Sequence, residues 1–122
     1  MSNAINWFEI PASDFDRAKK FYETVLNIQM MMPFPGMKYA MFPADSASGN
    51  VGGGLMEEEG FEPSTKGALI YLNGGEDLAL PLSRIEDAGG KVLLPKTSIG
   101  GNGFMARFID TEGNLVALHS MK

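Results

Sequence analysis

Three side chains of this sequence have the chemistry to act together: Glu9, Arg107 and His119. A carboxylate beside a neutral imidazole can accept and donate a proton near neutral pH, so Glu9 and His119 are the candidate catalytic residues. A guanidinium such as Arg107 can hold a carboxylate or stabilise an enolate oxygen. Two plainer alternatives stay open. His119 is a half-exposed residue near the C-terminus, or Glu9 and Arg107 form a structural ion pair.

The alternation of apolar and polar residues predicts which face of a strand each candidate occupies. Near the N-terminus, Phe8 and Ile10 make the better core pair, which leaves Glu9 on the opposite face. Near the C-terminus the same alternation leaves Arg107 and His119 on the face opposite the apolar residues Phe104, Ala106, Phe108, Val116 and Leu118. We therefore expect the three polar side chains to converge on one concave site.

Aromatic and methionine side chains predict an apolar wall around that site. Trp7, Tyr39 and Met41, together with Arg107, are the candidate ligand-binding residues. Methionine adapts to irregular apolar ligands, and Trp and Tyr add a hydrogen-bonding edge. Ordinary core filling is the alternative explanation for the methionines. The run Gly52-Gly53-Gly54 is either a wall that a flat ligand approaches closely or a bulged strand at a dimer interface.

The elements that position these residues occur twice along the chain. A strand over Ile5–Pro11 and a helix over Asp14–Leu26 open the first half, and a strand over Ala68–Leu72 and a helix over Asp77–Ala88 reopen the pattern. Further strands are expected over residues 28–32, 38–42, 51–56, 91–95, 104–109 and 115–120. Because each half is too small to bury a core alone, we expect the two halves to close on each other.

Composition excludes several classes of function. The chain has 122 residues, a net charge of −5 and no cysteine, so thiol nucleophiles, disulfides and thiolate metal sites are excluded. It shows no basic stripe and no apolar run of the roughly 20 residues that a membrane span needs, so we expect neither nucleic acid nor membrane as a partner. No secretory signal is visible, and a cytoplasmic location is the expectation.

Two motifs add a resemblance to a known family. Phe8-Glu9-Ile10-Pro11 leads into Asp14 and a helix that carries Arg17-Ala18 and Phe21-Tyr22, and a turn near the C-terminus reads Asp110-Thr111-Glu112-Gly113-Asn114. This ordered set resembles the vicinal oxygen chelate superfamily, which includes glyoxalase I, extradiol dioxygenases and bleomycin-resistance proteins. The resemblance implies an α+β fold of paired βαβββ modules that form a concave mixed sheet around a cavity, with helices on the outer face.

The same resemblance implies one domain over residues 1–122, with modules of about 4–57 and 67–121, and usually a homodimer. Metal-dependent members place one His, Glu or Gln ligand on each of four strands. By spacing from the motifs, those positions fall on Trp7, Gly52-Gly53-Gly54, Ala68 and Ala117. None of these side chains can coordinate a metal, so we expect no metal at these positions and no cofactor.

Three hypotheses for the function follow. The first is a small-molecule-binding protein of the glyoxalase/bleomycin resistance type that lacks the family's metal site. The second is an enzyme, a lactoylglutathione-lyase-like isomerase or lyase that acts on a small oxygenated metabolite through Glu9 and His119. The third is an interaction module that only dimerises. The sequence does not decide between an enzyme and a binding protein, because fold resemblance alone does not establish an activity.

Overall fold

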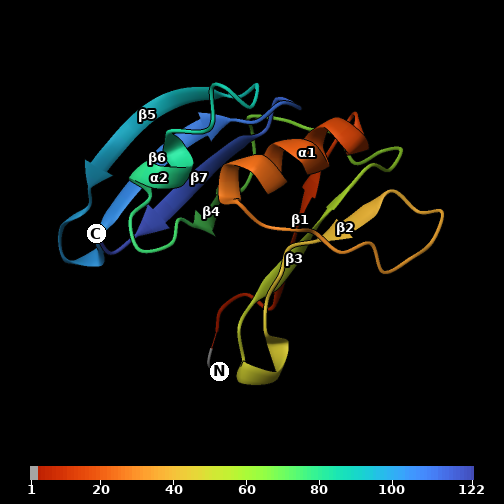
Figure 1. The fold of residues 1–122 in the computed structure, drawn as a ribbon, viewed down its shortest axis with the longest axis horizontal. Helices are drawn as coiled ribbons and strands as arrows, with labels where there is room; N and C mark the ends of the chain where they lie inside the picture. The colour runs from red at the N-terminus through yellow and green to blue at the C-terminus, as the bar shows by residue number, and fades with distance from the viewer. Residues whose placement is uncertain (1–2) are drawn as a thin grey trace.

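The computed structural model describes residues 3–122 and has the predicted α+β architecture (Figure 1). Within these residues the elements run in the order β1 (Trp7–Pro11), α1 (Phe15–Leu26), β2 (Tyr39–Met41), β3 (Gly52–Met56), β4 (Ile70–Asn73), α2 (Ala79–Leu82), β5 (Lys91–Ser98), β6 (Phe104–Ile109) and β7 (Leu115–Ser120). Short 3₁₀ helices lie at Ser46–Ser48 and Gly100–Asn102.

Each half of the chain forms a sheet on the same plan. In the first sheet the order is β1-β3-β2, with β1 parallel to β3 and β2 antiparallel to it. In the second sheet the order is β4-β7-β6-β5, with β4 parallel to β7 and the other pairs antiparallel. In both, the opening strand pairs with the last strand of its half, as the predicted repeat requires. The two sheets remain separate and do not close into one concave sheet.

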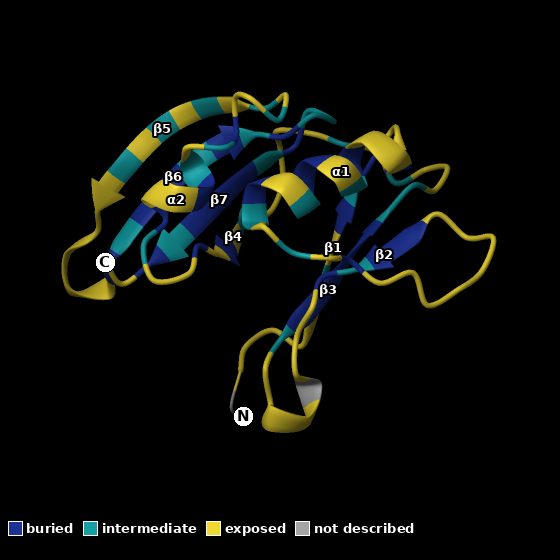
Figure 2. Ribbon diagram, viewed as in Figure 1, coloured by how far each residue is buried: buried dark blue, intermediate teal, exposed yellow. Residues whose placement is uncertain are grey.

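The helix α1 lies between the two sheets and supplies core residues to both (Figure 1). The Asp14 side chain accepts a hydrogen bond from the Arg17 N–H and begins the helix, and Asn27, with φ of 53°, ends it. Phe21 packs on Phe108 of the second sheet, with ring centroids 6.0 Å apart, and the neighbouring residue of α1 packs on Phe42 of the first half. Figure 2 shows the buried positions on the inner side of α1 and along β3 and β7.

The second helix is shorter than the sequence predicted. Residues 77–88 were expected to be helical, but the α-helix covers only Ala79–Leu82. After it, Arg84 N–H bonds to Pro81 O and Ile85 N–H bonds to Leu82 O, so the chain continues as tighter turns. Pro81 is the third residue of this helix, and its missing N–H removes only a bond to Asp77 O, so it accounts for the late start of the helix and not for its end at Leu82.

The expected strand over residues 28–32 is reduced to an isolated bridge between Met31 and Met41. The segment that follows contains Pro33 and Pro35, which have no N–H to donate to a sheet ladder. At the other end of the molecule β5 runs on to Ser98, three residues beyond its predicted end, with register shifts on both sides of Leu94.

The turn at Asp110–Asn114 ties the second half of the chain to the start of α1. One oxygen of Glu112 accepts hydrogen bonds from the Ser13 N–H, the Ser13 hydroxyl and the Asp14 N–H, at 3.0, 3.0 and 2.7 Å. Its other oxygen pairs with Nε of Arg17 at 2.8 Å. Burial alone would raise the pKa of Glu112, but the bonds from Arg17, Thr111, Asp14 and Ser13 outweigh it and lower the pKa from 4.5 to about 2.

Two more contacts complete this tie. The Tyr22 hydroxyl, inside the core, donates to a carboxylate oxygen of Asp110 at 2.6 Å. The amide of Asn114 donates to Pro11 O, at the end of β1, at 2.7 Å. Burial and the Asp110 carboxylate raise the pKa of Tyr22 well above its ordinary value. The Asp110–Asn114 motif therefore fixes β1 and α1 against the second sheet, which is a structural role.

Candidate functional site

The predicted alternation of the site strands is confirmed. One face of each sheet packs into the core shared with α1, and that face carries Phe8, Ile10, Phe104, Ala106, Phe108, Val116 and Leu118. We call the opposite face of each sheet its open face. Strand register places Glu9 beside Gly54 on the open face of the first sheet, and Arg107 beside Ala117 on that of the second.

Three of the predicted residues form a hydrogen-bonded cluster on the open face of the first sheet. The indole N–H of Trp7 donates to the Tyr39 hydroxyl at 3.1 Å, and that hydroxyl donates to Oε2 of Glu9 at 2.7 Å. Burial raises the pKa of Tyr39, and the bond to Glu9 adds to this. Met41 lies beside Gly54 on the same face. The Tyr39 hydroxyl therefore fixes the orientation of the Glu9 carboxylate.

The triple glycine gives the aromatic rings room to lie on β3. A methyl group at Gly52 would come within 3.2 Å of the six-membered ring of Trp7, and one at Gly54 would overlap the hydroxyl end of the Tyr39 ring. On the core face, a methyl group at Gly53 would overlap Phe8. The pairing of β3 with β1 and β2 runs without a register shift, so the alternative of a bulged strand is not found. The glycines make room for the protein's own rings, and the alternative of a wall for a flat ligand stays a prediction.

Arg107 and His119 lie on the open face of the second sheet. Nε of Arg107 is buried and has no hydrogen-bond partner within residues 3–122. Nε2 of His119 lies 2.7 Å from Asn102 O. Because a carbonyl oxygen only accepts, this nitrogen carries the proton of the contact, and Nδ1 is left for a ligand. A pocket of about 370 Å³ opens beside His119, lined also by Tyr71 and Asn73 of β4.

The structure thus groups the candidates as two clusters, one on each sheet. Trp7, Glu9 and Tyr39 bond to one another, whereas Arg107 and His119 occupy the other sheet. Within residues 3–122, no hydrogen bond or ion pair joins Glu9 to either of the latter. Convergence of all three polar groups on one site stays a prediction, and a Glu9–Arg107 ion pair is not found within this part of the chain.

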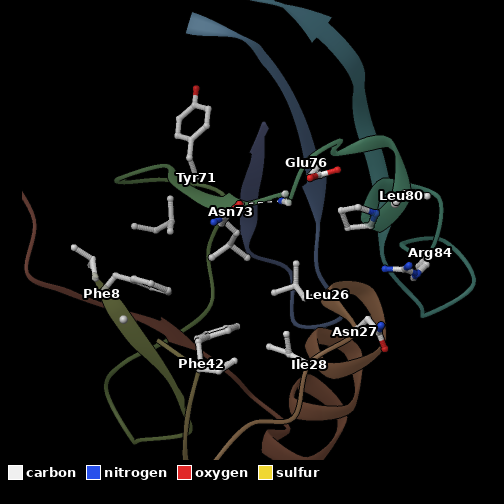
Figure 3. Close-up of a pocket in the computed structure, with 18 of the residues that line it drawn as sticks. Phe8, Leu26, Asn27, Ile28, Phe42, Tyr71, Asn73, Glu76, Leu80 and Arg84 are labelled. Carbon is white, nitrogen blue, oxygen red and sulfur yellow. Dashed lines mark hydrogen bonds between the residues drawn. The ribbon is translucent and has the colours of Figure 1, made fainter. Parts of the chain in front are cut away.

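A larger pocket than the one beside His119 lies between the two halves, on the side of the sheets that faces the helices (Figure 3). Its volume is about 820 Å³, and Phe8, Phe42, Leu26 and Ile28 line one side of it, facing β4 and the region of α2 with Arg84. None of the six predicted site residues lines it. Sequence reasoning did not identify the residues that line this pocket.

The positions at which the sequence resemblance implies metal ligands can be compared with the observed pairing. Trp7 lies beside Gly52, and Ala117 lies beside Tyr71. Ala68 precedes β4, so Tyr71 rather than Ala68 is the residue of that strand next to Ala117. In residues 3–122 no three His, Asp or Glu side chains are grouped as a metal site would need.

A separate question is membrane insertion. No helix within residues 3–122 is long and apolar enough to cross a bilayer.

Comparison with known proteins gives a consistent family. Residues 4–118 match the model of the Glyoxalase/Bleomycin resistance protein/Dioxygenase superfamily. A "Glyoxylase-like domain-containing protein" of Didymella fabae is 32% identical over 124 residues, covering 93% of this chain and 91% of that protein.

Solved structures share the fold at lower identity. A glyoxalase/bleomycin resistance protein from Albidiferax ferrireducens superposes with a TM-score of 0.72 at 16% identity, covering 95% of this chain and 98% of that one. A variant of the fosfomycin resistance protein FosX from Listeria monocytogenes, complexed with Mn(II) and 1S,2S-dihydroxypropylphosphonic acid, gives 0.65 at 18% identity, covering 100% and 93%.

Proposed function

Since this chain belongs to the glyoxalase/bleomycin resistance protein/dioxygenase superfamily, we propose that it binds a small organic molecule on the open faces of its sheets. The proposal includes the absence of a metal at the four family positions, where Trp7, the glycines of β3, Ala68 or Tyr71, and Ala117 offer none of the usual ligands. A cytoplasmic location, and the absence of nucleic acid and membrane partners, stay predictions within it.

The observation that carries the proposal is the unpaired nitrogen of Arg107. A buried N–H without a partner costs about 1–3 kcal/mol, and a bound carboxylate or enolate oxygen would remove that cost. Arg107 lies on the same face as His119, whose Nδ1 is free to accept a hydrogen bond. The first sheet offers a complementary surface, with a fixed carboxylate at Glu9 beside the indole of Trp7.

A homodimer is part of the same proposal. The two polar clusters lie on different sheets of one chain, and a second copy would bring the open face of its four-stranded sheet over the three-stranded sheet of the first. Exposed apolar side chains on or beside these faces support this, among them Trp7, Met31, Phe34 and Tyr71. In that arrangement Glu9 of one copy and Arg107 of the other would face one ligand.

Native mass spectrometry of the purified protein tests the proposal. We expect a dimer that carries a small organic molecule. We also expect the divalent metal content to stay below roughly a tenth of an equivalent per chain. Arg107→Gln should lose the molecule, whereas Arg84→Gln, at the other pocket, should keep it. If Arg107→Gln kept the molecule and Arg84→Gln lost it, the binding site would instead be the pocket between the modules. One equivalent of bound divalent metal would overturn the proposal that the family positions hold no metal.

The second candidate function is an isomerase or lyase. It is favoured by one observation, the carboxylate of Glu9 held by Tyr39 at 2.7 Å in the manner of a positioned general base. The same preparation separates the two functions. A binding protein releases its molecule unchanged on denaturation, whereas an enzyme converts it during incubation and loses that turnover in Glu9→Gln.

A further inference from the structure

We infer that the ligand carries a cationic group, such as a substituted ammonium, and that this group binds at Glu9 against the ring of Trp7. The inference rests on the proposed function and adds to it the chemical class of one end of the ligand. It concerns the open face of the three-stranded sheet, where Trp7, Tyr39 and Glu9 form the hydrogen-bonded cluster.

The charge of Glu9 is the first observation. Glu9 is exposed, and within residues 3–122 it has no cationic partner. Lys38, next to Tyr39 in the sequence, is already paired with Glu57 at 3.3 Å. The Tyr39 hydroxyl bonds to Oε2 only, so Oε1 accepts no hydrogen bond from the described residues. A fixed carboxylate with one free oxygen attracts a cation and repels an anion.

The aromatic surface beside that carboxylate is the second observation. Trp7 lies against Gly52 with its indole N–H bonded to Tyr39, and 43% of the residue is exposed. Phe34 packs on the Tyr39 ring with centroids 5.8 Å apart and is 48% exposed. The faces of such rings carry negative partial charge and attract cations, most strongly for Trp. Carboxylate and rings therefore select the same sign of charge.

A purely structural role accounts less well for this arrangement. A structural cluster would bury its carboxylate among several donors, as Glu112 is buried with its side chain 0% exposed. Here Tyr39 is the one described donor to Glu9, and the carboxylate stays open to solvent. The glycines of β3 also let the Trp7 and Tyr39 rings lie against the strand, while Trp7 and Glu9 stay exposed.

The single tryptophan of the chain is a built-in reporter for the test. Trp7 emission is titrated with choline and with 3,3-dimethylbutan-1-ol, in which carbon replaces the charged nitrogen at nearly the same shape. We expect choline to half-saturate the change at a concentration about tenfold lower than the neutral alcohol does. Glu9→Gln keeps an oxygen for Tyr39 but removes the charge, and should reduce the preference to less than about threefold. Glu59→Gln, in the acidic loop, should keep it.

The outcomes separate this inference from the proposed function. Equal responses to the two probes would overturn the cationic class while leaving a small-molecule site on this face. The absence of any change in Trp7 emission at the highest choline concentration tested would also overturn the cationic class. Loss of the co-purified molecule in Arg107→Gln is measured independently and would still support the proposed function. Unchanged emission of unliganded Glu9→Gln shows that the cluster is still folded.

Discussion

Glu112 is the side chain whose replacement should most directly test how the two modules are held together. Its side chain is 0% exposed, and it accepts bonds from Ser13, Asp14 and Arg17. The fall of its pKa from 4.5 to about 2 corresponds to about 3 kcal/mol of preference for the folded state. Because Arg17 is 51% exposed and water screens that pair, we expect the charge to contribute about 2 kcal/mol.

Glu112→Gln should therefore lower the free energy of unfolding by about 2 kcal/mol at pH 7. The amide keeps the shape of the side chain but turns an NH₂ group toward N–H donors. Urea unfolding followed by circular dichroism measures the change, and Glu59→Gln, an exposed charge in a loop, should shift the free energy by less than about 0.5 kcal/mol.

The pH dependence has a definite sign. The folded-state pKa of Glu112 lies below its unfolded value, so its stabilisation is complete above about pH 4.5 and is lost as the pH falls toward 2. The difference between wild type and Glu112→Gln should shrink across that range. A difference below about 0.5 kcal/mol at pH 7, or one that persists undiminished at pH 2, would refute this account of the tie between the modules.

Two further substitutions test the packing of the open face and of the core. Gly54→Ala places a methyl group where the phenol ring of the site now lies, and should cost about 1–3 kcal/mol and change Trp7 emission, whereas Gly101→Ala, in open space, should do neither. Tyr22→Phe removes the buried hydroxyl bonded to Asp110 at 2.6 Å and should cost about 1–3 kcal/mol. Tyr71→Phe, whose ring is exposed, is the matched control, and a similar loss in both tyrosine variants would contradict the role given to the buried bond.

The faces of the strands were predictable because the apolar residues on either side of Glu9 and of Arg107, and those next to His119, share one parity. Ile10, Val116 and Leu118 are buried in the shared core, and that fixes Glu9 and His119 on the opposite faces. A one-residue slip would have turned every side chain over, so the apolar pattern specifies the orientation strongly. Helix α1 was predictable for a similar reason, since its cap at Asp14 and its apolar stripe agree.

What the pattern could not predict depends on contacts between distant segments. The bond from Tyr39 to Glu9 requires β2 and β1 to flank β3, and the alternation of either strand alone does not specify its neighbour. The pocket beside Phe42 and Ile28 is completed by β4 and the region of α2, which belong to the other half of the chain. Local sequence therefore indicated the parts of the candidate site but left their grouping into two clusters undetermined.

The family's ligand positions are filled by packing in both modules. In the first, the large ring of Trp7 lies against Gly52, which has no side chain to offer. In the second, Ala117 is 0% exposed although it lies on the open face, because Tyr71 and Arg107 flank it on the neighbouring strands. A side chain introduced at Gly52 would crowd the Trp7 ring, and replacing Trp7 alone would leave only a glycine opposite it. Restoring a metal ligand in the first module would thus need changes on both β1 and β3, and the proposed function therefore relies on Glu9, Arg107 and His119 in place of a metal.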